Sequence, residues 1–142
     1  VAPVRSLAQR VVQRATLTDG TVTLELGTEY DLDALLEKLV KMGYKRELMV
    51  EQRGQMSVRG GIFDVFPISS ELPYRIEFFG DEIDSIRRFE PETQRSVDKE
   101  AAVRIVPQSE KRLLAQNKTA LATLLDYFPD NALIALDEHL AV

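Results

Sequence analysis

The chain contains no cysteine and only one histidine. Without cysteine it can form no disulfide, no thiolate nucleophile and no cysteine-ligated metal site, a composition that fits a reducing compartment. The histidine, His139, stands near the end of the chain, and a lone histidine cannot orient a metal ion or a nucleophile by itself. No uncharged apolar run approaches the roughly 20 residues that a helix needs to cross a bilayer. We therefore expect a cytoplasmic protein that has no metal, cofactor or membrane partner.

An excess of positive charge is also absent. The 18 Lys and Arg residues stand against 23 Asp and Glu, which gives a net charge of −5 and a pI of about 5.0. Such a chain is repelled by phosphate backbones overall, so nucleic-acid binding would require a strong local basic patch. The 142 residues, 44% hydrophobic and 29% charged, suit one folded domain, or one domain with pieces of a neighbour attached. Because the chain starts Val1-Ala2-Pro3 without a methionine, we expect a piece cut from a longer protein.

The phosphate-binding loop of P-loop nucleotide hydrolases is missing as well. That loop reads G-x-x-x-x-G-K-[ST], and no glycine of this chain is followed by lysine. The apolar run 132–136, followed by Asp137-Glu138, resembles the metal-holding strand of those enzymes, but without the loop we interpret it as structural. The acidic cluster of Asp81, Glu82 and Asp84 is typical of a solvated turn rather than a cation site. The sequence therefore predicts a module without catalytic activity.

Residues 1–43 have the pattern helix, strand, helix. Apolar residues at helical spacing predict a short helix over 4–12, and the alternation over 21–26 predicts a strand. The second helix follows Asp31, whose side chain suits an N-cap, and it ends at Gly43, which suits a C-cap.

Residues 44–107 change to a strand-like pattern, and a helical pattern returns afterwards. Turn residues about every 8 to 12 positions suggest an antiparallel meander. The candidate strands are 49–50, 56–59, 62–66, 74–79, 83–89 and 103–106. Residues 108–142 predict a helix over 110–127 and a short strand over 132–136. The whole pattern predicts an α+β fold, in which helices flank a mostly antiparallel sheet.

The strand 74–79 carries the most informative side chains. In a regular strand its apolar even-numbered residues lie on one face, and Arg75 and Phe79 lie on the other. Arginine and aromatic side chains are over-represented among interface hot spots, which suggests a contact surface for another protein. Alternatively, a helix or loop covers this face and Phe79 is ordinary core. The paired glycines Gly60-Gly61 allow a bulge or a tight turn that re-aims Arg59.

Two runs in order resemble a known family. The run 55–67 resembles the pattern G-x-F-x-x-R-G-x-x-x-D-[IVL]-[FY]-P, and 74–87 resembles R-[IV]-E-F-F-G-D-E-I-[DE]-S-I-R, extended over 89–93 by F-[DE]-P-x-T. Together they resemble the UvrA-interaction domain shared by the excision-repair protein UvrB and the transcription-repair coupling factors. The run 92–96, Glu-Thr-Gln-Arg-Ser, favours the coupling factors. The departures are Met56 in place of an aromatic residue and Phe63 where an aliphatic residue is common.

The resemblance implies a fold like the second domain of UvrB and a role in recruiting UvrA to stalled RNA polymerase. It makes 44–107 the core of the UvrA-interaction domain, 1–43 its lead-in, and 108–142 an incomplete return to the UvrB-like first domain. The family's UvrA-contacting residues fall on Arg59, Arg75 and Phe79. In the family a C-terminal module masks this surface. The resemblance also implies an ATP-dependent DNA translocase motor and an RNA-polymerase-binding module in other parts of the longer protein.

Three alternatives stay open. The chain could belong to UvrB, with the same UvrA-binding role. It could contact DNA directly through arginines, although the acidic balance argues against this; the candidates are Arg53, Arg59, Arg75, Arg87 and Arg88. It could also be a purely structural spacer, in which the Arg75 face is covered.

Overall fold

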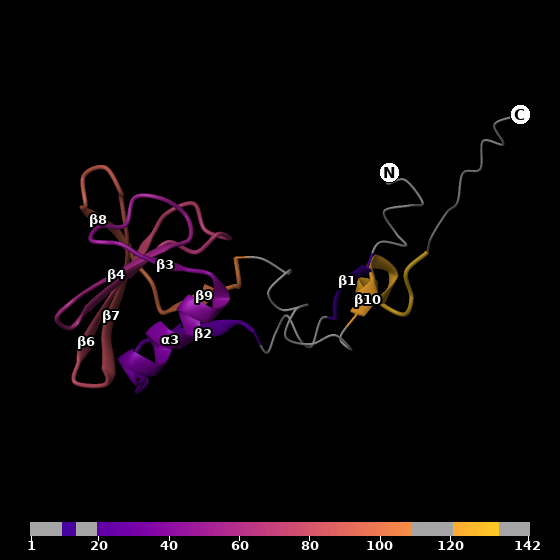
Figure 1. Cartoon of the computed structure of the whole chain (residues 1–142), viewed down its shortest axis with the longest axis horizontal. Coiled ribbons are helices and arrows are strands. Elements are labelled where there is room, and N and C mark those ends of the chain that lie inside the picture. Colours follow the sequence, from indigo (N-terminus) through magenta and orange to yellow (C-terminus); the bar gives the residue numbers. More distant parts are fainter. Residues whose placement is uncertain (1–9, 14–19, 109–120, 134–142) are drawn as a thin grey trace, which may run out of the picture.

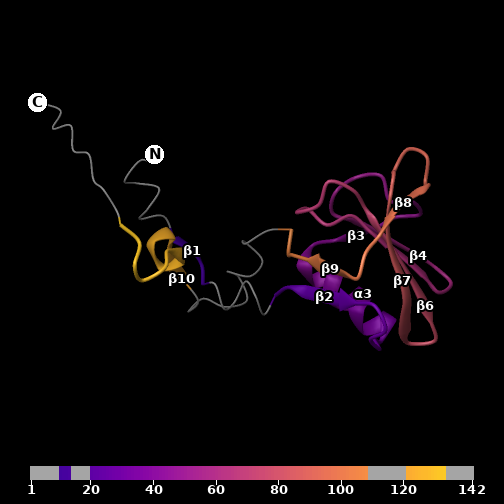
Figure 2. The ribbon, with the colours of Figure 1, turned by 180° about the vertical axis from the view of Figure 1, so that it is seen from behind.

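The computed structural model describes residues 10–13, 20–108 and 121–133, and Figures 1 and 2 show their elements from opposite sides. Within these ranges, no helix combines the length and the apolar character that crossing a membrane requires.

A six-stranded sheet with the strand order β3-β4-β5-β6-β7-β8 is the main element. Its strands are β3 (Lys45–Arg46), β4 (Gln55–Arg59), β5 (Ile62–Val65), β6 (Tyr74–Phe79), β7 (Glu82–Phe89) and β8 (Ser96–Lys99). β3 runs parallel to β4, and every other neighbouring pair is antiparallel. The expected α+β fold with a mostly antiparallel sheet is confirmed.

The helix α3 (Leu32–Met42) begins and ends at the two residues that the sequence indicates. The Asp31 side chain accepts hydrogen bonds from the backbone N–H groups of Asp33 and Ala34, at 3.0 and 3.1 Å. Gly43 ends the helix with φ of 107°, a left-handed conformation that glycine adopts without the steric cost of a Cβ atom. α3 buries Leu35 and Leu39 along one side, against the sheet.

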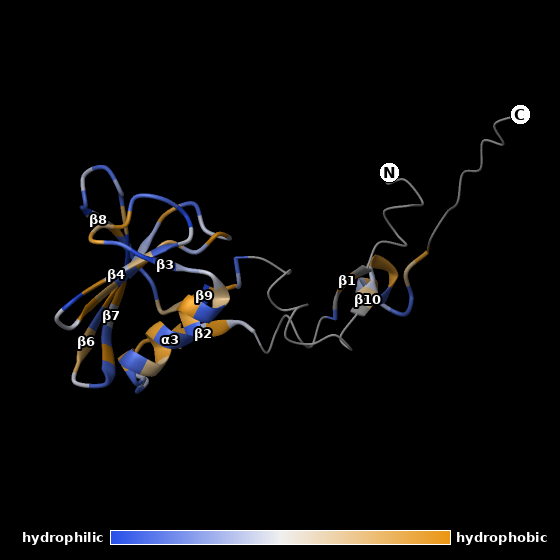
Figure 3. Ribbon diagram, in the orientation of Figure 1, coloured by the Kyte–Doolittle hydropathy of each residue, from blue (hydrophilic) through white to orange (hydrophobic). Residues whose placement is uncertain are grey.

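One face of the sheet packs on the main core. α3 and the antiparallel pair β2 (Val22–Glu25) and β9 (Ala102–Ile105) lie together on this side of the sheet in both views (Figures 1 and 2). The core contains Leu24, Leu39, Phe63, Ile76 and Ile86, all buried. Figure 3 shows both hydrophobic and hydrophilic positions along β7, of which Ile83 and Ile86 are buried in the main core whereas Glu82 and Asp84 are exposed.

A second, smaller cluster of Val50, Phe66 and Phe89 lies apart from the main core. Phe66 continues β5 on the same side as Asp64, and Phe89 lies under the guanidinium of Arg75. The cluster therefore lies on the opposite face of the sheet and covers part of that face.

Within residues 44–107, three expectations need correction. The predicted strand 49–50 is wrong, because both residues lie in a loop from which Val50 enters the small cluster. β8 was missed because all four of its residues are exposed and show no apolar alternation. The predicted strand 103–106 exists as β9, but it pairs with β2 and does not continue the meander.

The predicted terminal helices are wrong where the structure describes them. Arg10–Val12 forms strand β1, in keeping with the β-branched Val11 and Val12, and pairs with β10 (Leu121–Thr123). Asp126 then accepts hydrogen bonds from the backbone and the hydroxyl of Thr123, which starts the short 3-10 helix η1 (Leu124–Tyr127). The rest of both helices lies outside the described residues. So does most of the strand predicted over 132–136, of which Ala132 and Leu133 are not in a strand, and so does His139.

Candidate protein-docking face

The candidate site is the face of the sheet that points away from the main core, here called the outer face. Cross-strand register places its members side by side on β4, β5, β6 and β7. They are Ser57, Arg59, Ile62, Asp64, Arg75, Glu77, Phe79, Ser85 and Arg87. The outer face therefore brings together the three residues that the sequence indicated, Arg59, Arg75 and Phe79.

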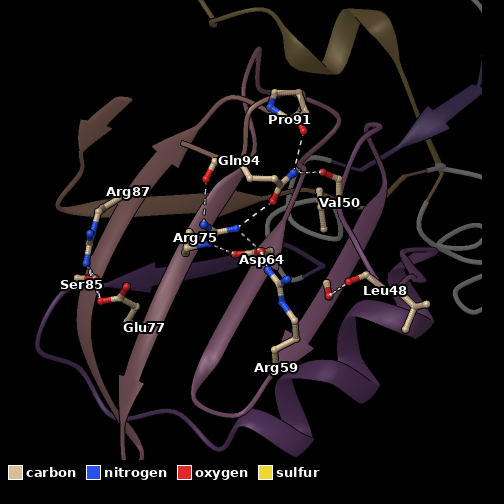
Figure 4. A network of polar contacts seen from close by, with 11 residues as sticks. Leu48, Val50, Arg59, Asp64, Arg75, Glu77, Ser85, Arg87, Pro91 and Gln94 are labelled. Atoms are coloured by element: carbon tan, nitrogen blue, oxygen red, sulfur yellow. Dashed lines mark hydrogen bonds and ion pairs between the residues drawn. The ribbon is translucent and has the colours of Figure 1, made fainter. Parts of the chain in front are cut away.

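Asp64 lies at the centre of the polar network on the outer face (Figure 4). Its side chain is 1% exposed, yet it carries a carboxylate. Arg75 donates from Nε and Nη2 to its two oxygens, at 2.8 Å each, and Arg59 donates from Nη2 at 3.1 Å. A buried charge is tolerated only when it is paired and hydrogen-bonded, and here the two arginines satisfy that condition.

Arg75 is largely enclosed by its partners. It also donates to the backbone and side-chain oxygens of Gln94, at 3.2 and 3.1 Å, and its guanidinium lies 4.5 Å from the centroid of the Phe89 ring. The hydrogen bond with Asp64 raises the pKa of Arg75 above its ordinary value, although burial acts in the opposite direction. Only 16% of the Arg75 side chain is exposed. Most of its hydrogen-bonding capacity is therefore used inside the domain.

Arg59 differs from Arg75 in exposure. It makes one hydrogen bond to Asp64, and 50% of its side chain remains exposed. It stands at the end of β4, directly before the Gly60-Gly61 turn. A cation that is held by one contact and still faces water is suited to meet an acidic group of another molecule.

A second polar group lies beside the first, on β6 and β7. Arg87 donates from Nη2 to Glu77 at 2.7 Å, and the Ser85 hydroxyl donates to the same carboxylate oxygen at 2.8 Å (Figure 4). In this group, on the open part of the outer face, the charges of Arg87 and Glu77 balance and Ser85 is neutral. The group provides polar surface without a net charge.

Phe79 is the most exposed aromatic residue on the described part of the chain, with 82% of its surface accessible. It is the last residue of β6, and the pairing with β7 shifts register between Glu77 and Phe78. Phe78 turns toward the main core, and its backbone N–H donates to the carbonyl of Gly61 at 2.7 Å. The interpretation of Phe79 as ordinary core is therefore wrong: the side chain points into solvent at the end of the sheet.

Sequence reasoning missed Asp64 and Gln94, which hold Arg75 in place. Asp64 carries a detectable signal, since an acidic residue inside the apolar run 62–66 requires a partner on the neighbouring strand. Gln94 carries almost no signal in the sequence that would indicate its role. It adopts a positive φ of 59°, and its side-chain amide donates to the carbonyl of Pro91 at 2.8 Å. The contacts of Gln94 with Arg75 depend on the loop that joins β7 to β8.

The arginines that could have marked a DNA-binding surface are paired within the domain. Arg59 and Arg75 contact Asp64, Arg87 contacts Glu77, and Arg88 contacts Asp98 and Glu100. Arg53 donates to the carbonyl of Ser70 and lies 5.8 Å from the centroid of the Phe66 ring. Phosphate binding needs cations that are free to replace counterions, and these pairings reduce their number.

Within residues 10–13, 20–108 and 121–133, no three His, Asp or Glu residues are grouped so that they could hold a metal ion. The fold is a small α+β domain, whose outer face exposes an arginine, Arg59, and a phenylalanine, Phe79.

Comparison with known families identifies this domain. The family model described as the UvrB interaction domain matches residues 22–110, and the chain belongs to that family. The matched range includes β2, α3 and β9 as well as the six-stranded sheet.

The chain is also similar to several transcription-repair coupling factors. It is 40% identical over 118 residues to the one from Myxococcus xanthus, which covers 83% of this chain and 10% of that protein. It is 44% identical over 110 residues to the one from Staphylococcus aureus strain USA300, covering 78% of the chain and 9% of the relative. For Escherichia coli K12 the identity is 37% over 110 residues, with 78% and 10% covered. The chain thus spans about a tenth of the length of these relatives.

Proposed function

We propose that this chain is the part of a transcription-repair coupling factor that docks UvrA, and so recruits it to stalled RNA polymerase in nucleotide excision repair. Support comes from the family, from the coupling-factor relatives, and from the outer face. The observation that carries the proposal is the placement of an 82% exposed Phe79 on the same face of the sheet as the half-exposed Arg59. Interface hot spots combine these two residue types.

The two exposed residues have separate tasks in this proposal. Arg59 pairs with an acidic group of UvrA and guides the approach, because charge pairs mainly affect association rate and orientation. Phe79 enters an apolar pocket of UvrA, and its burial slows dissociation. Each task predicts a different kinetic signature.

Arg75 contributes mainly through its internal contacts. Its exposed edge is small, so its direct contact with UvrA is limited, whereas its hydrogen bonds fix Asp64 and through it Arg59. The proposal therefore retains all three residues but gives direct contact chiefly to Arg59 and Phe79.

The remaining parts of the proposal concern the longer protein. Residues 44–107 form the core of the UvrA-docking unit, and the flanks 1–43 and 108–142 connect it to a UvrB-like first domain. A C-terminal module of that protein masks the outer face until a large-scale opening occurs. RNA polymerase and DNA bind elsewhere in the protein, whose ATP-dependent translocase motor acts in the cytoplasm.

The test is binding of this chain to purified UvrA, measured as equilibrium affinity and as association and dissociation rates. Phe79→Ala is expected to weaken binding by about 2 kcal/mol or more, which is roughly 30-fold, mainly through faster dissociation. Phe128→Ala is the matched control, because Phe128 is an exposed phenylalanine outside the six-stranded sheet. Arg59→Ala is expected to slow association and to reduce its dependence on salt.

Two outcomes would contradict the proposal. The first is a folded wild-type chain that does not bind UvrA. The second is equal binding by the wild type, Phe79→Ala and Phe128→Ala at unchanged fold. Affinity for duplex DNA that falls steeply with salt would instead favour a DNA-contacting role.

A further inference from the structure

Leu48 is a nearly fully exposed leucine whose backbone is nevertheless fixed. Its side chain is 93% exposed, in the segment that follows β3. The buried Ser57 donates its hydroxyl to the Leu48 carbonyl at 3.0 Å, and the adjacent Glu47 N–H donates to the Met56 carbonyl at 2.8 Å. These bonds hold the segment against β4, so the leucine is presented to solvent at a defined place.

A groove connects Leu48 to the outer face. It has a volume of about 370 Å³, and its lining combines the apolar Leu48 and Val58 with the polar or charged Arg46, Glu47, Ser57 and Arg59. Figure 4 shows Leu48 at one side of the polar network and Arg87 at the other, with Arg59 and Asp64 between them. Leu48 therefore borders the same half-exposed arginine that belongs to the proposed docking face.

Strand geometry gives the distance between Leu48 and Phe79. Leu48 lies beside β4 on the side of β3, and Phe79 ends β6, two strands away from β4. With strands about 4.8 Å apart and a rise of about 3.3 Å per residue, the two side chains are separated by roughly 20 Å. A specific interface buries about 800 Å² on each partner, which corresponds to a patch roughly 30 Å across. One partner of ordinary size can therefore cover both residues together with Arg59.

We infer that Leu48 is a second apolar anchor of the docking face, and that UvrA covers the groove between Leu48 and Arg59 and packs an apolar side chain against Leu48. This inference rests on the proposed function and extends it. Two apolar anchors, Phe79 and Leu48, then flank the exposed cation Arg59. The arrangement fits an interface in which buried apolar contacts surround a charge pair.

The test compares two leucines of nearly equal exposure. Leu48→Ala removes the proposed anchor, and Leu133→Ala is the matched control, because Leu133 is 96% exposed and lies outside the sheet. With purified UvrA, Leu48→Ala is expected to lower affinity about tenfold, and Leu133→Ala is expected to leave it unchanged. Ser57→Ala keeps the Leu48 side chain but releases its carbonyl, so it should weaken binding by a smaller factor at unchanged fold.

Phe79→Ala, measured in the same series, separates this inference from the proposed function. If Phe79→Ala weakens binding while Leu48→Ala and Leu133→Ala behave alike, UvrA docks on the outer face without using Leu48, and the inference is wrong. If the folded wild type does not bind UvrA at all, the proposed function fails first. A shift of the Leu48 methyl resonances on addition of UvrA, with those of Leu133 unchanged, is the expected direct signature.

Discussion

The buried carboxylate of Asp64 provides the sharpest test of how the outer face is held together. Asp64→Asn keeps the size of the side chain and one acceptor oxygen, but it removes the negative charge that Arg59 and Arg75 share. Three guanidinium N–H groups donate to the carboxylate at 2.8 to 3.1 Å. In the variant, the mostly enclosed Arg75 loses its counterion.

The expected loss follows from the burial of the pair. Removing one partner of a buried ion pair costs about 3 to 5 kcal/mol, because the other charge stays buried without compensation. Arg75 keeps 16% exposure and two acceptors on Gln94, so the lower end of this range applies. We therefore expect Asp64→Asn to lower the free energy of unfolding by about 3 kcal/mol. That is a large part of the stability of a small domain, about 5 to 15 kcal/mol.

Urea denaturation followed by circular dichroism measures this loss. With a denaturant slope of about 1.5 kcal/mol per molar urea, the midpoint is expected to fall by about 2 M. Arg59→Gln is the control, because its half-exposed pair with the same carboxylate should contribute no more than about 1 kcal/mol. The double variant Asp64→Leu with Arg75→Met removes both charges and should recover most of the stability.

Either of two results would contradict the stabilising role of the buried Asp64–Arg75 ion pair. One is an Asp64→Asn variant whose unfolding free energy stays within about 0.5 kcal/mol of the wild type, since a buried unpaired guanidinium would then carry no cost. The other is a double variant that is as unstable as the single one. That result would show that the site requires the specific geometry of these side chains rather than charge balance.

Two further predictions concern the turn beside Phe79 and the core. A Cβ atom on Gly61 would lie 2.7 Å from the carbonyl oxygen of Phe78, so Gly61→Ala should lower the free energy of unfolding, measured in urea, by about 1 to 3 kcal/mol and displace Phe79. Gly60 has open space around it but a φ of 60°, so Gly60→Asn should cost only about 1 kcal/mol, because asparagine tolerates the left-handed conformation better than other residues with a Cβ atom. Burial raises the pKa of Tyr44 to about 12, against a backbone hydrogen bond with Ile68. Because the folded protein favours the neutral phenol, the contribution of Tyr44 to the free energy of unfolding is complete below pH 10 and is lost between about pH 10 and 12. Tyr44→Phe should remove this loss of stability, which urea midpoints measured as a function of pH would show.

Local patterns predicted much of the sheet and the helix. The strand 74–79 has the same bounds in the structure, and the predicted 56–59 and 83–89 differ from β4 and β7 by one residue at the start. Alternation decided these strands because each has one face in the core. α3 was predictable from its caps, since Asp31 and Gly43 satisfy backbone groups that any helix leaves unpaired.

The predictions at the two ends failed for a physical reason. A few apolar residues at helical spacing also suit a short strand when another segment pairs with them, and β1 and β10 pair with each other. β1 and β10 are more than 100 positions apart in the sequence, so no local window contains both strands. β8 shows the same limitation, because its hydrogen bonds with β7 define it and its side chains do not.

The α+β class, the capped helix, the central strands and the choice of Arg59, Arg75 and Phe79 could be read from local patterns and from the family motif. The accessibility of these three residues depends on the folded chain. Asp64 and Gln94 enclose Arg75 from other strands and loops, whereas Phe79 and Arg59 stay accessible. The exposure of a side chain depends on segments distant in sequence, which local periodicity does not contain.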